Sequence, residues 1–244
     1  MTNQRTLIIG ANSNIAQAIA TQILNDADQG LILISRDLST YQNIDEVSAR
    51  CIPVENYSLQ SIKQAVELIP QIDEKPITKV FICNGILHTQ DIKPEKRLED
   101  LDVEAFNQVI TTNTLMPMLW IQQLTPLLTG NSACKLVVFS ARVGSISDNR
   151  LGGWYTYRAS KAALNMMLKT AAIELARRAK NIKIIAFHPG TTDTPLSKPF
   201  QNNVPAGKLF TSEFVAEQLL TIVDNTDIDG KASYLDWQGK AINW

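Results

Sequence analysis

Tyr157 and Lys161 are the pair of residues whose types and spacing most directly suggest chemistry. They lie four positions apart in a segment rich in Ala, Leu, Met and Lys, so a helix would place both side chains on one face. A lysine ammonium beside a phenol favours the phenolate and lowers the phenol pKa from about 10 toward neutrality. Tyr157 could then act as a general acid toward a carbonyl and as a general base toward an alcohol. Such a pair also arises by chance, so the surrounding sequence must support this interpretation.

A second candidate site is Gly10–Ala16, which follows an apolar run and leads directly into a helical segment. In an open α/β sheet, such a turn can direct backbone N–H groups and a helix N-terminus at a phosphate. Gly10 tolerates a positive φ, and Asn14 enters that region more readily than most residues. A full glycine fingerprint is absent. Taken alone, the segment could also be a strand–helix turn without a ligand.

Ser35, Arg36 and Asp37 stand at the end of the second apolar run. An acidic residue at this place would bind a ribose diol, whereas a basic residue would pair with a 2′-phosphate. The order Ser35-Arg36 favours the phosphate, while Asp37 leaves a ribose contact open. The alternative for Arg36 is a solvated loop charge.

Continuous apolar runs of strand length predict strands that are buried on both faces, as in a parallel sheet. These runs are Thr6–Ile9, Leu31–Ile34, Val80–Cys83, Leu136–Phe139 and Ile182–Phe187, with Cys51–Val54 and Ser233–Leu235 as weaker candidates. Helical patterns lie between them, over Ile15–Leu24, Ser61–Leu68, Glu104–Leu128, Tyr157–Arg178 and Ser212–Val223. This alternation predicts an α/β fold, a single doubly wound Rossmann-type domain over residues 1–244, with about seven parallel strands and helices on both faces. The irregular stretch Pro189–Thr211 is long enough to be a lid, so residues 190–211 are expected to cover a substrate.

The composition excludes several classes of protein. With 23 Lys and Arg against 24 Asp and Glu among 244 residues, nothing in the net charge of −1 favours nucleic acid or an anionic membrane as a partner. The longest apolar stretch, Leu115–Ile121, is too short to span a bilayer. Met1–Arg5 is polar and shows no signal peptide, and three widely spaced cysteines favour a reduced, cytoplasmic chain. His88 and His188 have no partner at ligand spacing, so no metal site is expected.

Together these residues resemble the short-chain dehydrogenase/reductase family over essentially the whole chain. The matching motifs stand in family order: Gly10–Ala16, Cys83–Gly85, Asn113, Ser140–Gly144, Tyr157 with Lys161, and Pro189-Gly190 through Thr194. The phrase from Gly152 to Lys161 most resembles the branch that contains bacterial C-factor-like proteins and sniffer-type carbonyl reductases. These motifs are specific for the fold and superfamily, and much less so for the substrate.

The resemblance implies an oxidoreductase that transfers a hydride between NADP(H), or NAD(H), and the carbonyl or alcohol of a partly apolar small molecule. It implies catalytic roles for Tyr157, for Lys161, which also binds the nicotinamide ribose, and for Asn113, which holds a proton-relay water. It points to a homodimer or homotetramer. The residues then expected at the cofactor are Gly10, Asn12, Ser13, Asn14, Ile15, Arg36, Asn84, Gly85, Asn113, Tyr157, Lys161, Pro189, Gly190, Thr192 and Thr194.

The sequence departs from the family at the catalytic serine. Alignment on Gly144 puts Ala141 where the family has serine, with Ser140 one residue earlier and Ser145 after the glycine. Adjacent side chains of a strand face opposite ways, so Ser140 could serve only at a bulged or shifted strand end. We expect Ser140 to fill the role; Ser145, or no serine at all, are the alternatives.

A competing interpretation is a low-turnover dinucleotide-binding sensor or a C-factor-like signalling protein. Ala141 favours it, whereas the intact Tyr157, Lys161 and Asn113 count against it. An interaction protein without a cofactor is a third possibility, which would require Gly10–Ala16 to be an empty turn. The residues therefore favour an NADP-dependent carbonyl reductase.

Overall fold

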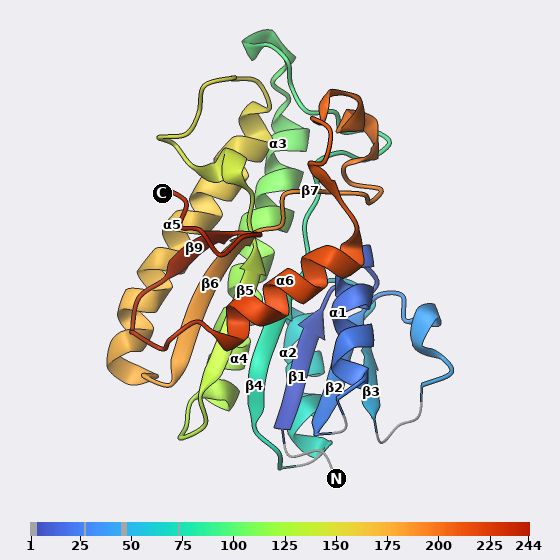
Figure 1. Ribbon diagram of the computed structural model, residues 1–244, viewed down its shortest axis with the longest axis vertical. Helices are drawn as coiled ribbons and strands as arrows, with labels where there is room; N and C mark the ends of the chain where they lie inside the picture. Colours follow the sequence, from blue (N-terminus) through green and yellow to red (C-terminus); the bar gives the residue numbers. More distant parts are fainter. Residues whose placement is uncertain (1–3, 27, 45–47, 73) are drawn as a thin grey trace.

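The computed structural model describes residues 4–26, 28–44, 48–72 and 74–244. Its centre is a sheet of seven parallel strands in the order β3-β2-β1-β4-β5-β6-β9 (Figure 1). The strands are β1 (Gln4–Ile9), β2 (Gln29–Ser35), β3 (Ala49–Pro53), β4 (Ile77–Ile82), β5 (Cys134–Phe139), β6 (Ile182–His188) and β9 (Ser233–Asp236). The chain moves outward from β1 to β3 and then returns to place β4 on the other side of β1. This order confirms the predicted doubly wound sheet, whose ligands bind where the strand order reverses.

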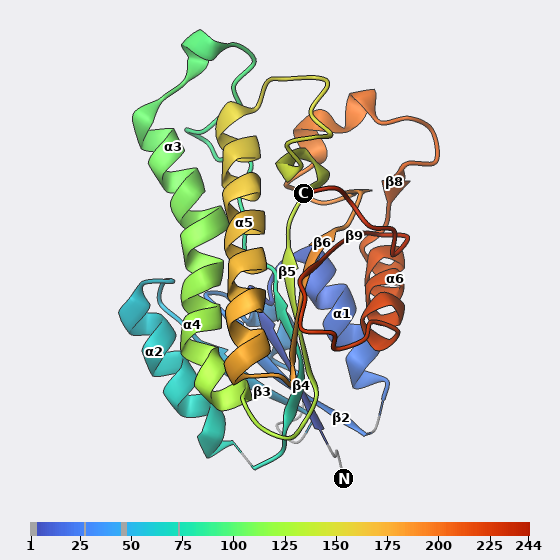
Figure 2. The same cartoon turned by 90° about the vertical axis from the view of Figure 1, so that its left-hand side faces the viewer.

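Helices cover both faces of the sheet (Figure 2). On one face lie α1 (Asn14–Leu24) and α6 (Ser212–Asp224). On the other lie α2 (Leu59–Leu68), α4 (Met116–Leu128) and α5 (Tyr155–Arg178), with α3 (Val103–Ile110) leading into α4. Within the described part of the chain, no helix is both long and apolar enough to cross a membrane.

The predicted helix Glu104–Leu128 is interrupted. A π-helical turn, Thr111–Leu115, joins α3 to α4, and Pro117 and Pro126 stand within the first and last turns of α4. A π turn accommodates one extra residue in a helix, and such turns are frequent at functional sites. Here it carries Asn113, which is fully buried.

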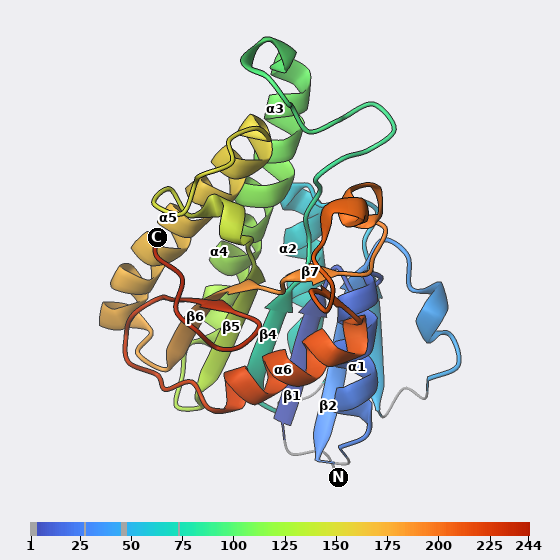
Figure 3. The same cartoon turned by 45° about the horizontal axis from the view of Figure 1, so that its top comes forward.

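Three long connections gather beyond the carboxyl ends of the strands (Figure 3). They are residues 83–102, residues 140–154 and Pro189–Thr211. The last of these is more ordered than its sequence predicts, because β7 (Thr191–Thr192) pairs in parallel with β8 (Leu209–Phe210). A short 3-10 helix, Lys198–Asn203, lies between these two strands. The pairing of β7 with β8 therefore joins the two ends of this segment.

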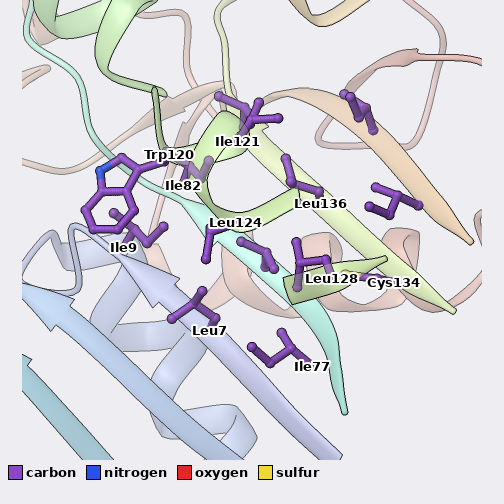
Figure 4. Packing of buried hydrophobic residues seen from close by; sticks show 14 of the residues in the cluster. Leu7, Ile9, Ile77, Ile82, Trp120, Ile121, Leu124, Leu128, Cys134 and Leu136 are labelled. Carbon is purple, nitrogen blue, oxygen red and sulfur yellow. The ribbon is translucent and has the colours of Figure 1, made fainter. Parts of the chain in front are cut away.

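The apolar runs that predict the strands also build the core (Figure 4). Trp120 and Leu124 of α4 lie against Leu7 and Ile9 of β1 and Ile82 of β4, and all five are almost completely buried. Burying one such side chain contributes roughly 1.5–3 kcal/mol. Close packing on both faces makes the sheet a rigid base for the loops at its carboxyl end.

Candidate active site

A cavity of about 510 Å³ opens at the carboxyl ends of β1, β4, β5 and β6. Its size is that of a site for a small molecule or cofactor. Most of the residues predicted to bind cofactor or substrate line it: Asn12, Ser13, Asn14, Ile15, Asn84, Gly85, Ser140, Tyr157, Lys161, Pro189, Gly190, Thr192 and Thr194. Gly10, Arg36 and Asn113 stand outside its wall.

The turn after β1 presents the N-terminus of α1 to this cavity. Gly10 has φ of +74°, and its N–H donates to the Ile34 carbonyl at 2.9 Å. A Cβ at Gly10 would lie 3.2 Å from the Asn84 Nδ2, so the turn also needs the missing side chain for space. Ser13 caps the helix by accepting the Ala16 N–H at 3.3 Å. Asn14 is the first helical residue and does not use the left-handed region.

Several buried polar atoms of the cavity wall have no partner within the described residues. They are the Asn84 Oδ1, the Thr192 Oγ1 and the His188 Nδ1. An unpaired buried polar atom is costly, and each such atom calls for an explanation. All three residues line the cavity, so its wall carries hydrogen-bonding capacity that the described residues do not use.

Tyr157 and Lys161 stand side by side on α5 and face the cavity. The Lys161 Nζ lies 5.9 Å from the centre of the Tyr157 ring and donates to the Phe139 carbonyl at 2.8 Å. Burial lowers the pKa of Lys161 to about 8. Burial also raises the pKa of Tyr157, with a smaller contribution from Tyr234. This is opposite to the direction expected from the spacing, because burial disfavours the charged phenolate.

Asn113 lies directly behind this pair. Its Nδ2 donates to the Ile86 carbonyl at 2.8 Å and to the Ser160 Oγ at 3.0 Å, and its Oδ1 accepts the Ile86 N–H at 2.7 Å. A Cβ at Gly85 would lie 3.4 Å from the Asn113 Oδ1 and 3.6 Å from the Lys161 Nζ. The Asn113 amide and the Lys161 ammonium therefore both lie next to Gly85.

The two candidate serines lie in different surroundings. The Ser140 N–H donates to the Phe187 carbonyl at 2.8 Å, which continues the regular pairing of β5 with β6. Its hydroxyl donates to the Asn165 Oδ1 at 2.6 Å, although the residue lines the cavity. Ser145 is buried away from the cavity wall, with its hydroxyl 3.4 Å from that of Ser147. The strand end is therefore not shifted, and the Ser140 hydroxyl points to α5.

Ala141, at the family's serine position, lines the cavity beside Tyr157. Its carbonyl accepts the Tyr234 hydroxyl at 2.6 Å. Burial raises the pKa of Tyr234, so this hydroxyl stays protonated and donates. Sequence reasoning missed Tyr234 and Asn165, since neither lies in a recognisable motif.

Arg36 is exposed at the end of β2, with its guanidinium carbon 5.4 Å from the centre of the Tyr57 ring. Asp37 instead binds the phosphate-type turn, since its Oδ2 accepts from the Asn12 Nδ2 at 3.1 Å. The Ser39 N–H donates to the other oxygen, and these hydrogen bonds lower the pKa of Asp37. The acidic side chain therefore holds two loops together, while Arg36 lies over an aromatic face.

Aromatic rings form one wall of the cavity; Phe200 lies in the segment expected to cover the substrate, whereas the place of Trp154 was not predicted. Trp154 packs edge to face on Tyr157, with ring centres 6.2 Å apart, and on Phe200 at 5.0 Å. Phe200 in turn packs on His88 at 5.7 Å. The uncharged Gly152-Gly153-Trp154 segment before α5 is the sequence feature that could have indicated an apolar wall. No periodic pattern, however, predicts the orientation of these rings. No cluster of three potential metal ligands occurs among the described residues.

The doubly wound sheet, the phosphate-type turn and the paired Tyr157 and Lys161 together define an oxidoreductase that uses a dinucleotide. The family model for short chain dehydrogenases matches residues 4–205. The chain therefore belongs to this family, and it is an NAD(P)-dependent enzyme of it. The unpartnered polar atoms of the cavity wall fit such a cofactor, whose amide and hydroxyl groups can both donate and accept.

Named relatives agree with this assignment. The chain is 27% identical to a 1-hydroxy-2-glutathionyl-2-methyl-3-butene dehydrogenase of Rhodococcus sp. (strain AD45), over 98% of each chain. It is also 27% identical to the C-signal of Myxococcus xanthus, over 60% of this chain and 83% of that one. The solved structure of the carbonyl reductase Sniffer of D. melanogaster matches 100% of both chains with a TM-score of 0.83 at 17% identity. The predicted resemblance is thereby confirmed.

Proposed function

We propose that the chain is an NADP-preferring carbonyl reductase that acts on partly apolar aldehydes or ketones, or on the corresponding alcohols. One observation carries this proposal. Tyr157 and Lys161, with Asn113 behind them, face a cavity that has a phosphate-type turn at one end and an aromatic wall at the other. Such a cavity suits a dinucleotide and a small carbonyl compound side by side.

Bound NADP(H) would supply or accept a hydride. The chain's own residues would handle the proton and the charge. Tyr157 gives a proton to the carbonyl oxygen, and the Lys161 ammonium stabilises the phenolate that results and holds the nicotinamide ribose. Asn113 holds the water from which the proton is restored. Ser140 remains the serine proposed to contact the carbonyl oxygen. Because the end of β5 is regular rather than shifted, this contact requires the Ser140 hydroxyl to leave Asn165 and rotate toward the cavity that the residue lines.

Arg36 supports the preference for NADP. Its guanidinium is exposed at the end of β2, the strand whose end receives the adenosine ribose in this fold. The Arg36 guanidinium carbon lies 5.4 Å from the centre of the Tyr57 ring, and a guanidinium can bind a phosphate through two parallel N–H groups. Asp37 is already bound to Asn12 and Ser39, so it competes less for a ribose diol.

The segment 190–211 is proposed as the substrate lid. Leu196, Phe200 and Val204 line the cavity from this segment, together with Leu87 and Trp154 from other connections. The Ser197 hydroxyl donates to the Thr192 carbonyl at 2.5 Å and holds the lid to its base. These apolar side chains support a substrate with an apolar body next to its carbonyl group.

A homodimer or homotetramer is also proposed. Met166, Met167 and Ile173 are exposed on α5, and Leu115 is exposed on the adjoining π turn. A group of exposed apolar side chains on neighbouring helices supports burial against a second copy of the chain.

A second candidate function is a dinucleotide-binding sensor with little turnover. Ala141 at the serine position favours it, as does the hydrogen bond that turns the Ser140 hydroxyl to Asn165. Without a donor aimed at the carbonyl oxygen, transition-state stabilisation would fall.

Two measurements decide between these functions. The affinities for NADPH and NADH are measured by fluorescence, and the oxidation of the preferred cofactor is then followed with a panel of aliphatic and aromatic carbonyl compounds. Tight NADPH binding with turnover of apolar carbonyls supports the reductase. Tight NADPH binding without turnover of any carbonyl in the panel would contradict the reductase and support the dinucleotide-binding sensor. If neither NADPH nor NADH binds, both proposed functions are contradicted.

A further inference from the structure

The helix that carries Tyr157 and Lys161 begins without a capping side chain of its own. Trp154 occupies the N-cap position of α5 with φ of 53°, and it is the only non-glycine residue of the described chain in the left-handed region. Tryptophan cannot accept the N–H groups of the first helical turn, which have no partner inside the helix. The left-handed conformation is also unfavourable for a large side chain. Something outside the helix must therefore hold this end in place.

Glu95, in the connection between β4 and α3, holds the N-terminus of α5 in place. The Glu95 main-chain carbonyl accepts the Trp154 N–H at 2.6 Å. One oxygen of its carboxylate accepts the Thr156 N–H at 3.2 Å, and the other accepts the Thr156 hydroxyl. Both side chains are buried, with 5% of Glu95 and 3% of Thr156 exposed. Glu95 thus supplies the cap from about 60 positions away in the sequence, and a carboxylate suits the positive end of a helix.

Of the two residues that Glu95 binds, Trp154 lines the candidate site and Thr156 adjoins a residue that does. Thr156 immediately precedes Tyr157, so fixing the Thr156 backbone also fixes the helical turn from which the phenol projects. Trp154 lines the cavity and packs edge to face on the Tyr157 ring. Glu95 also lies with Tyr157 on the wall of a small second cavity. One buried carboxylate therefore sets both the backbone and a ring contact of the tyrosine.

Gly153, next to the hydrogen bond between Glu95 and Trp154, must be a glycine. A Cβ at Gly153 would lie 3.4 Å from the Glu95 carbonyl oxygen, and Gly153 itself has φ of +64°. Arg158 then braces the turn from the helix side, since its Nε donates to the Gly153 carbonyl at 2.8 Å and its guanidinium to Gly152 at 3.0 Å. The approach to α5 is thus held from both sides, by Glu95 and by Arg158.

We propose that Glu95 is a positioning residue for the reaction, and that it holds Tyr157 at the distance and angle required for proton transfer. The inference rests on the proposed role of Tyr157 as proton donor. It assigns no contact of Glu95 with substrate or cofactor.

The test compares Glu95→Ala and Glu95→Gln with Asp102→Ala. Asp102 is a matched control, because its Oδ1 caps α3 by accepting the Ala105 N–H at 2.8 Å and it lies outside the cavity wall. We expect Glu95→Ala to lower kcat by about 10- to 100-fold, since small misplacements of a reacting group have effects of this size. The KM for NADPH should change little, and Glu95→Gln, which keeps an acceptor oxygen, should recover part of the rate. Asp102→Ala should leave kcat unchanged.

Hydrogen exchange measured by mass spectrometry gives a readout that does not depend on activity. Glu95→Ala should speed exchange at residues 154–158 and leave α3 unchanged, whereas Asp102→Ala should do the reverse. If Glu95→Ala does not fold, Thr156→Val replaces it, because this variant removes the hydroxyl donor and keeps the shape and the backbone N–H. For Thr156→Val we expect a smaller fall in kcat of the same kind.

Tyr157→Phe separates the failure of this inference from that of the proposed function. If Tyr157→Phe turns over normally, the proton-donor role fails whatever Glu95 does. If Tyr157→Phe is inactive while the Glu95 variants, or Thr156→Val in their place, keep normal kcat and normal exchange at residues 154–158, the positioning role of Glu95 is overturned. Equal falls in kcat for Glu95→Ala and Asp102→Ala would also overturn it, because the effect would then be one of general stability.

Discussion

Gly144 lies so close to Lys161 that a Cβ added to it would stand 2.8 Å from the lysine Cβ and from its carbonyl carbon. The short turn after β5 therefore packs directly against the backbone of α5. At the other end of the same lysine, the ammonium reaches back to the Phe139 carbonyl of β5. Lys161 is thus fixed at its backbone and at its charged end by one strand and the turn that follows it.

Gly144→Ala should push the turn away from α5. Forced overpacking of this kind destabilises a protein by about 1–3 kcal/mol. Urea unfolding should show this loss, and turnover should fall because Lys161 moves with its helix. Gly130→Ala is the control, since a Cβ at Gly130 would meet no atom within 4 Å. Equal stability of the two variants would contradict the close contact.

Tyr157→Phe keeps the ring, and with it the contact with Trp154, but removes the phenolic hydroxyl. We expect carbonyl reduction to fall by ~100-fold or more, the loss typical of a missing general acid. Fluorescence titration should show unchanged NADPH binding. Near-normal turnover would remove Tyr157 from the mechanism.

Ser140→Ala and Ser145→Ala test which serine, if either, contacts the carbonyl oxygen. Loss of a donor aimed at developing charge costs about 3 kcal/mol in the transition state, so Ser140→Ala should lower kcat by roughly 100-fold. Ser145→Ala should have much less effect, because its hydroxyl lies beside Ser147 and away from the cavity. Steady-state kinetics with NADPH saturating makes the comparison. Normal rates in both variants would favour the sensor.

Arg36→Ala should weaken NADPH binding by on the order of 2 kcal/mol, because one charge-assisted contact with the 2′-phosphate is lost. NADH lacks that phosphate, so its affinity serves as the internal control and should be unchanged. Calorimetric titration of both cofactors measures the difference. Equal weakening of both would mean that Arg36 contributes only its packing on Tyr57.

Lys161 should make stability depend on pH. Its folded pKa of about 8 lies below the ordinary value of 10.5, so between these pH values the unfolded chain binds more protons than the folded one. The free energy of unfolding should therefore gain up to about 3 kcal/mol from this residue as the pH rises through that window. Urea unfolding of the cofactor-free protein should show the rise, and Lys161→Met should remove it. The same slope in both proteins would refute the assignment.

Much of the fold could be predicted because each central strand is a continuous apolar run. The edge strand β9 was only a weak candidate, since Ser233–Asp236 alternates buried and half-buried residues. The π turn could not be predicted, because nothing in the helical pattern of Glu104–Leu128 marks one extra residue. β7 and β8 are two residues each and are formed by pairing between distant segments.

The residues around the site were predicted better than their orientations. Motif spacing placed Tyr157 and Lys161 on one face, but the direction of the Ser140 hydroxyl depends on Asn165, which belongs to no motif. The pKa of Tyr157 depends on burial, which spacing does not report. Glu95 could not be found at all, because its partners lie far along the chain.

The π turn changes which faces of α3 and α4 are buried against their neighbours. Each residue of a helix turns its side chain by about 100°, so an extra residue rotates everything after it by that amount. Before the turn, α3 packs against α5; after it, α4 directs Trp120 and Leu124 to the sheet and also packs against α2. A regular α-helix without the extra residue would keep its buried side chains along one face of the helix. The change of phase at Thr111–Leu115 lets α3 pack against α5, which carries Tyr157, while α4 packs against the sheet, α2 and α5.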